Sequence, residues 1–60
     1  MKNLQFKVGD RVFYIGANVS IKYRSGTITK LFELFQGASV LFDGDEHVKD
    51  LFIYNLQYEN

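Results

Sequence analysis

The residues of this 60-residue chain that could carry out acid–base or metal chemistry gather in one segment, 43–47. Asp43, Asp45 and Glu46 could offer oxygen ligands to Ca²⁺, and His47 beside Glu46 could act as a general base. No nucleophile is placed with His47, and the carboxylates lack the full ligand spacing of a calcium loop. A hairpin turn at Asp43-Gly44-Asp45 and a solvated His47 explain the segment, so we expect no catalytic residue, metal or cofactor.

Basic residues offer a second chemistry, the binding of phosphate. Lys22 and Arg24 flank Tyr23 in a polar loop that runs from Gly16 to about Arg24, where they could contact phosphates while the tyrosine stacks on a base. Further basic residues are expected nearby, at Lys7, Arg11 and Lys30. Zero net charge and the acidic C-terminal half weaken this interpretation, because acidic strands beside the basic loop would repel phosphate. Nucleic-acid binding is therefore the alternative hypothesis.

The charges divide between the two halves of the chain. Residues 1–30 contain six basic residues and one acidic residue, whereas residues 31–60 contain one basic and six acidic residues, so the halves carry +5 and −5. Neighbouring strands could pair these charges across a surface. Alternatively, the chain could present a bipolar surface whose basic side meets an anionic partner.

Aromatic side chains make up 17% of the chain, more than a core of this size easily encloses. We expect most rings to fill the core, with tyrosine hydroxyls reaching water. Exposed rings such as Tyr14, Phe35 and Tyr54, with a charged rim, would form a protein-binding or self-association surface. Protein binding is the leading hypothesis.

The elements that position these residues are short strands, because the apolar pattern has a period of two. Alternation from Thr27 to Phe32 predicts that Ile28, Lys30 and Phe32 share one face of a strand. Broken alternation in the fourth strand predicts a bulge near Lys49-Asp50. The predicted strands are 11–15, 27–32, 38–42, 46–52 and 57–58, with a 3₁₀ turn over 53–56. These elements form one domain over 1–60, with an ordered core of about 6–58.

Phe6-Lys7-Val8-Gly9-Asp10-Arg11-Val12 resembles the opening of Tudor and other SH3-like barrel domains. Gly26-Thr27-Ile28 resembles their second strand, Val40-Leu41-Phe42-Asp43-Gly44 their third strand and turn, and Leu56 their closing 3₁₀ leucine. The resemblance implies an all-β, five-stranded, SH3-like (Tudor-like) barrel that binds proteins or nucleic acid. Phe42 matches one position of the Tudor methyl-lysine cage, but the positions near Gly16, Arg24 and Asp45 are not aromatic, so methyl-lysine reading is not expected.

A weaker resemblance links Gly9-Asp10-Arg11-Val12 to the type II dihydrofolate reductases, which are tetrameric enzymes. Their late Val-Gln-Ile-Tyr run corresponds to Leu51-Phe52-Ile53-Tyr54. Phe52 replaces the glutamine that hydrogen-bonds ligand, and a phenylalanine cannot form that bond. We therefore expect a binding module and not an enzyme.

Three remaining features concern the surroundings of the protein. The absence of cysteine excludes disulfides and thiolate metal sites. Residues 1–5 lack an apolar secretory core, and no apolar run approaches the roughly 18 residues of a membrane span, so a cytoplasmic location is expected. A short chain rich in Phe, Ile, Asn, Lys and Tyr suggests a bacterial or phage origin, and a phage-encoded modulator of a host protein would suit the leading hypothesis.

Overall fold

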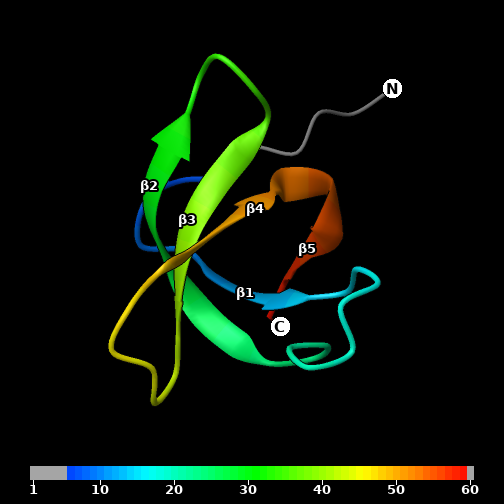
Figure 1. Cartoon of the computed structure of the whole chain (residues 1–60). Helices are drawn as coiled ribbons and strands as arrows, with labels where there is room; N and C mark the ends of the chain where they lie inside the picture. Colours follow the sequence, from blue (N-terminus) through cyan, green and yellow to red (C-terminus); the bar gives the residue numbers. More distant parts are fainter. Residues whose placement is uncertain (1–5, 60) are drawn as a thin grey trace.

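The strand-forming segments pair into one twisted antiparallel sheet in the computed structural model, which describes residues 6–59 (Figure 1). The strands lie in the order β4–β3–β2–β1–β5. This confirms an all-β chain of five strands with a 3₁₀ turn before the last one. The elements are β1 (Arg11–Tyr14), β2 (Ser25–Phe32), β3 (Gly37–Phe42), β4 (Lys49–Phe52), the 3₁₀ turn η1 (Ile53–Asn55) and β5 (Leu56–Tyr58).

The sheet is open at both ends of its strand order. Strands β4 and β5 are its edges, joined by η1, and within residues 6–59 they are not paired with each other. Among these residues no helix has both the length and the apolar character needed to cross a membrane.

The predicted turn at Asp43-Gly44-Asp45 is present, but it does not join β3 and β4 as a tight hairpin, because the loop continues to Lys49. The Asp45 N–H donates to the Phe42 carbonyl at 3.0 Å, and Gly44 has a φ of +90°. Glycine adopts this left-handed conformation without a steric penalty, which explains its position in the turn.

The pairing between β3 and β4 runs in continuous register along all of β4, so the bulge predicted near Lys49-Asp50 is wrong. β4 begins at Lys49 and not at Glu46. Val48 therefore lies in the preceding loop, where strand alternation does not apply, and this explains the broken pattern without a bulge.

The irregularity lies instead in β2. Ile28 pairs with Val40 and Lys30 pairs with Ser39, so Thr29 is an extra residue that β3 does not match. Such an insertion bends a strand and increases its twist. A long strand such as β2 can therefore belong to a strongly curved sheet (Figure 1).

The bulge changes which side chains of β2 share a face. Ile28 is buried, and Leu31 pairs with a residue of the buried face of β3. Leu31 consequently faces the core side, and its neighbours Lys30 and Phe32 lie on the outer face. The extra residue Thr29 interrupts the regular alternation between Ile28 and Lys30. The prediction that Ile28, Lys30 and Phe32 share one face is wrong for this reason.

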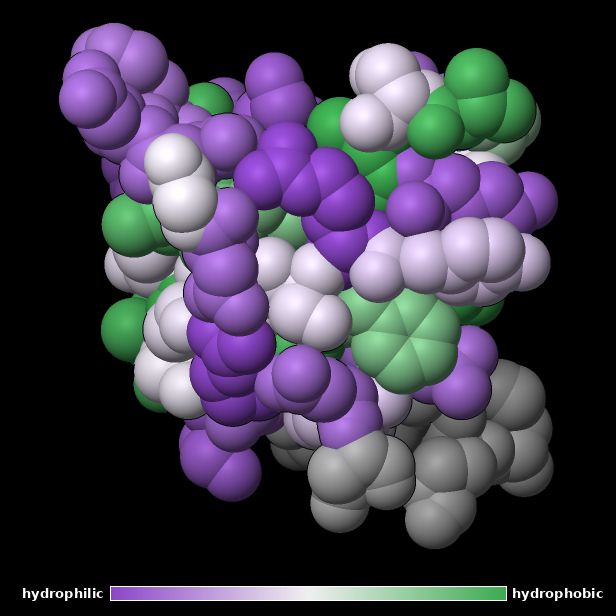
Figure 2. Space-filling model, turned by 90° about the horizontal axis from the view of Figure 1, so that it is seen from below, coloured by the Kyte–Doolittle hydropathy of each residue, from purple (hydrophilic) through white to green (hydrophobic). Residues whose placement is uncertain are grey.

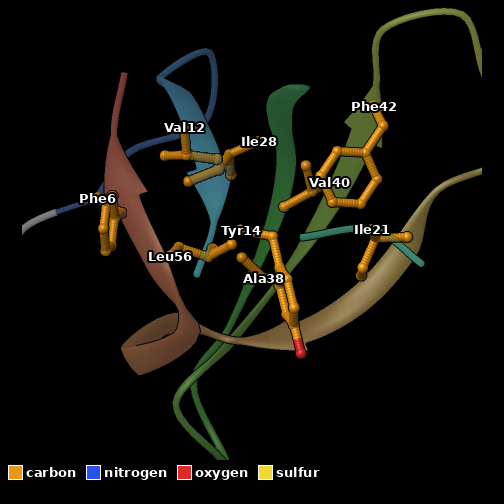
Figure 3. Packing of buried hydrophobic residues seen from close by; sticks show 9 residues of the cluster. All are labelled: Phe6, Val12, Tyr14, Ile21, Ile28, Ala38, Val40, Phe42 and Leu56. Atoms are coloured by element: carbon orange, nitrogen blue, oxygen red, sulfur yellow. The ribbon is translucent and has the colours of Figure 1, made fainter. Parts of the chain in front are cut away.

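Nine side chains form the core, and they converge from one face of the sheet and from its loops (Figure 3). Five of them, in β1, β2 and β3, are almost completely enclosed: Val12, Ile28, Ala38, Val40 and Phe42. The other core members are Phe6, Tyr14, Ile21 and Leu56. Leu51 and Ile53 pack against this core from β4 and η1, which closes the side of the core nearest the β4 edge.

Candidate binding surface

The outer face of the sheet ends in a row of residues contributed by three strands. Phe32 of β2 pairs with Gly37 of β3, and Gly37 pairs with Phe52 of β4. Gly37 has no side chain, and the ring of Phe35, from the β2–β3 turn, occupies the space where a Cβ of residue 37 would lie. The turn therefore folds back over the sheet and places a third ring between the two on the strands.

Four rings make up this surface, which we call the aromatic row: Phe32, Phe35, Phe52 and Tyr54. Phe32 and Phe35 stack with centroids 5.1 Å apart, and Phe35 meets Phe52 edge to face at 5.8 Å. Tyr54 of η1 stacks on Phe52 at 5.0 Å with the ring planes 9° apart. Aromatic pairs of this geometry stabilise each other beyond the area they bury, by about 0.5–1.5 kcal/mol. The row is thus organised before any partner binds.

Much of the aromatic row faces water. Phe35 is 44% exposed, Phe52 45% and Tyr54 63%, and the neighbouring Leu34 is fully exposed at the tip of the turn. The tip lies at the top of Figure 1. Figure 2 shows the opposite end of the molecule, where hydrophilic residues predominate and hydrophobic ones are scattered. Other exposed apolar side chains, such as Val8, Val19 and Val48, lie in other loops, and the aromatic row differs from them in that its rings contact one another.

A groove of about 310 Å³ lies between the β2–β3 turn and η1. Its two sides are tied together by the Ile53 N–H, which donates to the Gln36 carbonyl at 2.9 Å. We call it the hairpin groove, and its lining residues are Phe6, Leu31, Phe32, Glu33, Phe35, Gln36, Gly37 and Ile53. Most of these are apolar, and Glu33 is the ionisable residue among them. The aromatic row and the groove share Phe32 and Phe35, so they form one continuous surface.

The predicted phosphate-binding loop has a different character. Lys22 and Tyr23 are exposed, with the Lys22 Nζ 5.5 Å from the centre of the tyrosine ring. Arg24 is already occupied: its guanidinium donates to Asp45 at 3.1 Å and to the Asp43 carbonyl at 3.0 Å. Lys22 and Tyr23 are consequently the members of this trio that solvent or a ligand can reach freely.

Tyr23 has an unusual backbone conformation, with a φ of +70°. Bulky residues rarely adopt this region because the Cβ crowds the backbone. Hydrogen bonds from the Tyr23 N–H to the Tyr14 carbonyl at 2.8 Å and from the Arg24 N–H to the Ile21 carbonyl at 3.0 Å fix the turn. The fold of the loop, and not a preference of tyrosine, imposes this conformation.

Arg11 joins the basic half of the chain to the acidic half. Its guanidinium makes two hydrogen bonds to Asp43, at 2.7 and 2.8 Å, and one to Glu59 at 2.9 Å. These bonds lower the pKa of the Asp43 carboxyl, because they favour its ionised form. A third ion pair joins Arg24 to Asp45, so all three ion pairs among residues 6–59 connect the two halves. Of the two alternatives for the charge distribution, pairing between the halves is thus observed at Arg11 and Arg24.

Two residues expected at a binding surface are buried instead. Tyr14 is 5% exposed and Phe42 0% exposed, and both belong to the core (Figure 3). Tyr14 is covered because the following loop folds over it, and the Asn18 N–H donates to its hydroxyl at 3.2 Å. The ring of Phe42 is covered by Arg24, whose guanidinium carbon lies 5.3 Å from the ring centre. Neither ring is available as an exposed contact.

The structure brings Phe35 and Tyr54 together, as parts of the aromatic row. It adds Phe32 and Phe52, which the sequence did not single out as binding residues. The signal for Phe52 was weak, since a phenylalanine in a predicted strand is normally assigned to the core. The outward position of Phe32 depends on the bulge at Thr29, which is a feature of pairing with β3.

The acidic segment holds no recognisable metal centre. Asp45, Glu46 and His47 line a shallow polar hollow beside Lys49. Within residues 6–59, no three side chains of His, Cys, Asp or Glu come together as a set that could hold a metal ion.

Comparison of the chain with protein-family models, curated proteins and solved structures gives no match.

Proposed function

We propose that this chain is a non-enzymatic SH3-like barrel module that binds another protein through the aromatic row and the hairpin groove. An antiparallel sheet with a 3₁₀ turn between its last two strands supports the fold part of the proposal. Leu56 supports it as well. This residue is buried directly after η1, where SH3-like barrels have a closing leucine according to the resemblance.

The observation that carries the binding proposal is the exposure of stacked rings at one end of the molecule. Contiguous exposed apolar surface is uncommon on monomeric proteins and marks interaction sites when polar residues surround it. Aromatic residues are enriched at the centres of protein interfaces, because rigid rings bury a large area with little loss of conformational entropy. The mutual stacking of Phe52 and Tyr54 reduces that entropy loss further.

Nucleic-acid binding has less support from the same contacts. Arg11 and Arg24, the two arginines of the chain, are each committed to carboxylates. A phosphate that approached either arginine would have to displace an ion pair and meet the released carboxylate. Lys22 and Tyr23 alone offer a small site, whereas backbone binding gains most of its affinity from several phosphate contacts.

The test is capture of a partner by the immobilised full chain from a lysate of the source cells, with two matched variants. Phe35→Ala removes the central ring of the aromatic row. Leu34→Ala removes a more exposed apolar side chain next to it, outside the row. We expect a partner protein that wild type and Leu34→Ala retain and Phe35→Ala loses. Binding of the purified partner should weaken about tenfold or more with Phe35→Ala, as is usual for an aromatic at the centre of an interface.

Salt separates this proposal from the alternative. An aromatic interface should retain its partner when the salt concentration rises from about 50 to about 200 mM, a range that includes physiological ionic strength. Short single- and double-stranded DNA, titrated into the ¹⁵N-labelled chain, should leave the amide signals of residues 22–24 unmoved. Salt-sensitive shifts there, or a partner lost with Lys22→Ala but kept with Phe35→Ala, would contradict the proposal and favour nucleic acid.

A further inference from the structure

The hairpin groove combines an apolar wall with a single carboxylate. Its lining includes Phe6 of the core and Ile53, which packs against the core, together with Leu31 and the rings of Phe32 and Phe35. Glu33 is the ionisable residue of the lining. The volume, about 310 Å³, is at the lower limit of the roughly 300–1,000 Å³ of small-molecule sites. A groove of this size suits one long side chain of a partner better than a larger ligand.

Long basic side chains match such a groove. Arginine and lysine bury their aliphatic stems along apolar surface and keep the charged group at its rim. The guanidinium of arginine also stacks on aromatic faces and can form two parallel hydrogen bonds to one carboxylate. Phe32 and Phe35 would supply the faces, and Glu33 the carboxylate. A negatively charged side chain would meet the Glu33 carboxylate without a compensating cation among the lining residues.

The chain itself already uses this mode of contact. Arg24 lies over Phe42 at 5.3 Å while its guanidinium bonds to Asp45, so one guanidinium satisfies both a ring and a carboxylate. In addition, the Lys30 ammonium lies 5.2 Å from the centre of Phe32, one of the rings of the groove. Lys30 is not part of the groove lining. The Phe32 ring thus already contacts a cation of the chain, and the guanidinium of a partner would compete with Lys30 for it.

We infer that the hairpin groove receives an arginine side chain of the protein partner, with its stem against Leu31 and Ile53 and its guanidinium between Phe35 and Glu33. The inference rests on the proposed function and specifies the chemistry that the partner presents. The groove is distinct from the position where the Tudor resemblance would place a ligand. That position includes Phe42, which is buried under Arg24.

The direct test is a titration of the ¹⁵N-labelled full chain with blocked tripeptides at millimolar concentration. The probes are acetyl-Ala-Arg-Ala-amide, the same peptide with citrulline, which has the shape of arginine without the charge, and the same peptide with glutamate. The arginine peptide should shift the amide signals of Glu33 to Gly37 and of Ile53 in a saturable way. The citrulline peptide should bind more weakly, and the glutamate peptide should leave these signals unmoved.

Two charge variants and a control make the test specific. Glu33→Gln should weaken the arginine peptide about 2- to 5-fold, the range for a partly exposed ion pair. Lys30→Gln should strengthen binding, since it removes a like charge near Phe32. Glu46→Gln removes an exposed carboxylate from the β3–β4 loop, away from the groove, and should leave binding unchanged.

The outcomes distinguish this inference from the proposed function. Equal binding of the arginine and citrulline peptides, an unchanged affinity with Glu33→Gln, or no shifts in the groove would overturn the inference, even if a partner is captured through Phe35. Conversely, arginine-selective shifts that depend on Glu33, without any partner whose capture depends on Phe35, would support the inference and contradict the proposed protein partner.

Discussion

The ring of Phe35 lies over Gly37, in the space that a side chain at position 37 would fill. This relationship places the β2–β3 turn against the outer face of the sheet and sets the position of the central ring of the aromatic row. Gly37 is thus a positioning residue for the binding surface, because it lacks the side chain that would exclude the Phe35 ring from this position.

Gly37→Ala should displace the Phe35 ring from Phe32 and Phe52 and lower the free energy of unfolding by up to roughly 2 kcal/mol. The new methyl group removes two aromatic contacts, each worth about 0.5–1.5 kcal/mol. Replacing a glycine inside a strand returns about 0.5–1 kcal/mol, which offsets only part of that loss. The aromatic proton shifts of the three rings should change in NMR spectra, and the urea midpoint should be lower than that of wild type.

Phe35→Ala is the reference for that experiment. If displacement of the ring is the effect of Gly37→Ala, both variants should alter the Phe32 and Phe52 ring signals in the same direction. Unchanged ring signals in Gly37→Ala would show that Phe35 does not depend on the missing side chain.

Tyr23→Gly should make the protein more stable than Tyr23→Ala by roughly 1 kcal/mol. Both variants remove the exposed ring, so their difference isolates the backbone. The left-handed φ of +70° costs a residue with a Cβ about 1–2 kcal/mol, and glycine escapes that cost but loses about 0.5–1 kcal/mol through its greater freedom when unfolded. Thermal unfolding should show a difference of about 4–8 °C between the variants.

Equal stability of the two variants would mean that the turn relaxes around alanine. If Tyr23→Gly is also more stable than wild type, then the tyrosine ring does not compensate for the strain. Its retention would then point to a role for the exposed ring outside folding.

Residue types along the chain were sufficient to locate the strands and the turn at Gly44, because alternation and turn chemistry are local properties. The face of each side chain was less accessible. Thr27 to Phe32 alternates regularly in sequence, and only pairing with β3 reveals that Thr29 is extra. Burial of Tyr14 likewise depends on a loop that folds back over it, so the tyrosine looked suited to the surface.

The same local limits applied to the candidate site. Phe35 and Tyr54 were singled out because the chain has more rings than a small core encloses, and the same argument wrongly included Tyr14. Their convergence with Phe32 and Phe52 could not, since it requires four segments to meet in space. Arg24 was assigned to ligand binding because it flanks Tyr23 in a polar loop, and its bond to Asp45, 21 residues away in sequence, is visible only in the folded chain.

The face assignment in β2 can be tested by comparing Ile28→Val with Lys30→Ala. Ile28 is 1% exposed in the core, so removal of one methylene should lower the free energy of unfolding by about 0.5–1.5 kcal/mol. Lys30 points outward, and its replacement should change stability by about 0.5 kcal/mol or less. Urea denaturation of the three proteins measures both effects.

Deletion of Thr29 tests what the bulge contributes to the sheet. Without the extra residue, Ile28 and Lys30 become neighbours and can still pair with Val40 and Ser39, so the side chains of β2 keep their faces and only the bend and extra twist of the strand are lost. We expect the deleted chain to fold with a lower urea midpoint than wild type. Unchanged stability would show that the bulge is not needed for the observed packing.

Acid should weaken the fold through the ion pair of Asp43 with Arg11. The hydrogen bonds from Arg11 lower the pKa of Asp43 in the folded chain, whereas the unfolded chain has an aspartate pKa of about 3.9. A lowered folded-state pKa means that the pair stabilises the fold above about pH 4 and that this stabilisation is lost as the pH falls through the folded pKa. Urea midpoints should therefore differ between wild type and Asp43→Asn at pH 7 and converge near pH 2. Glu46→Gln, which removes a carboxylate without a partner among the ion pairs of residues 6–59, should not show this convergence. If Asp43→Asn and wild type instead keep a constant difference from pH 7 to pH 2, the asparagine has lost packing and not an ion pair, and Arg11 does not hold the acidic half of the chain to the basic half through charge.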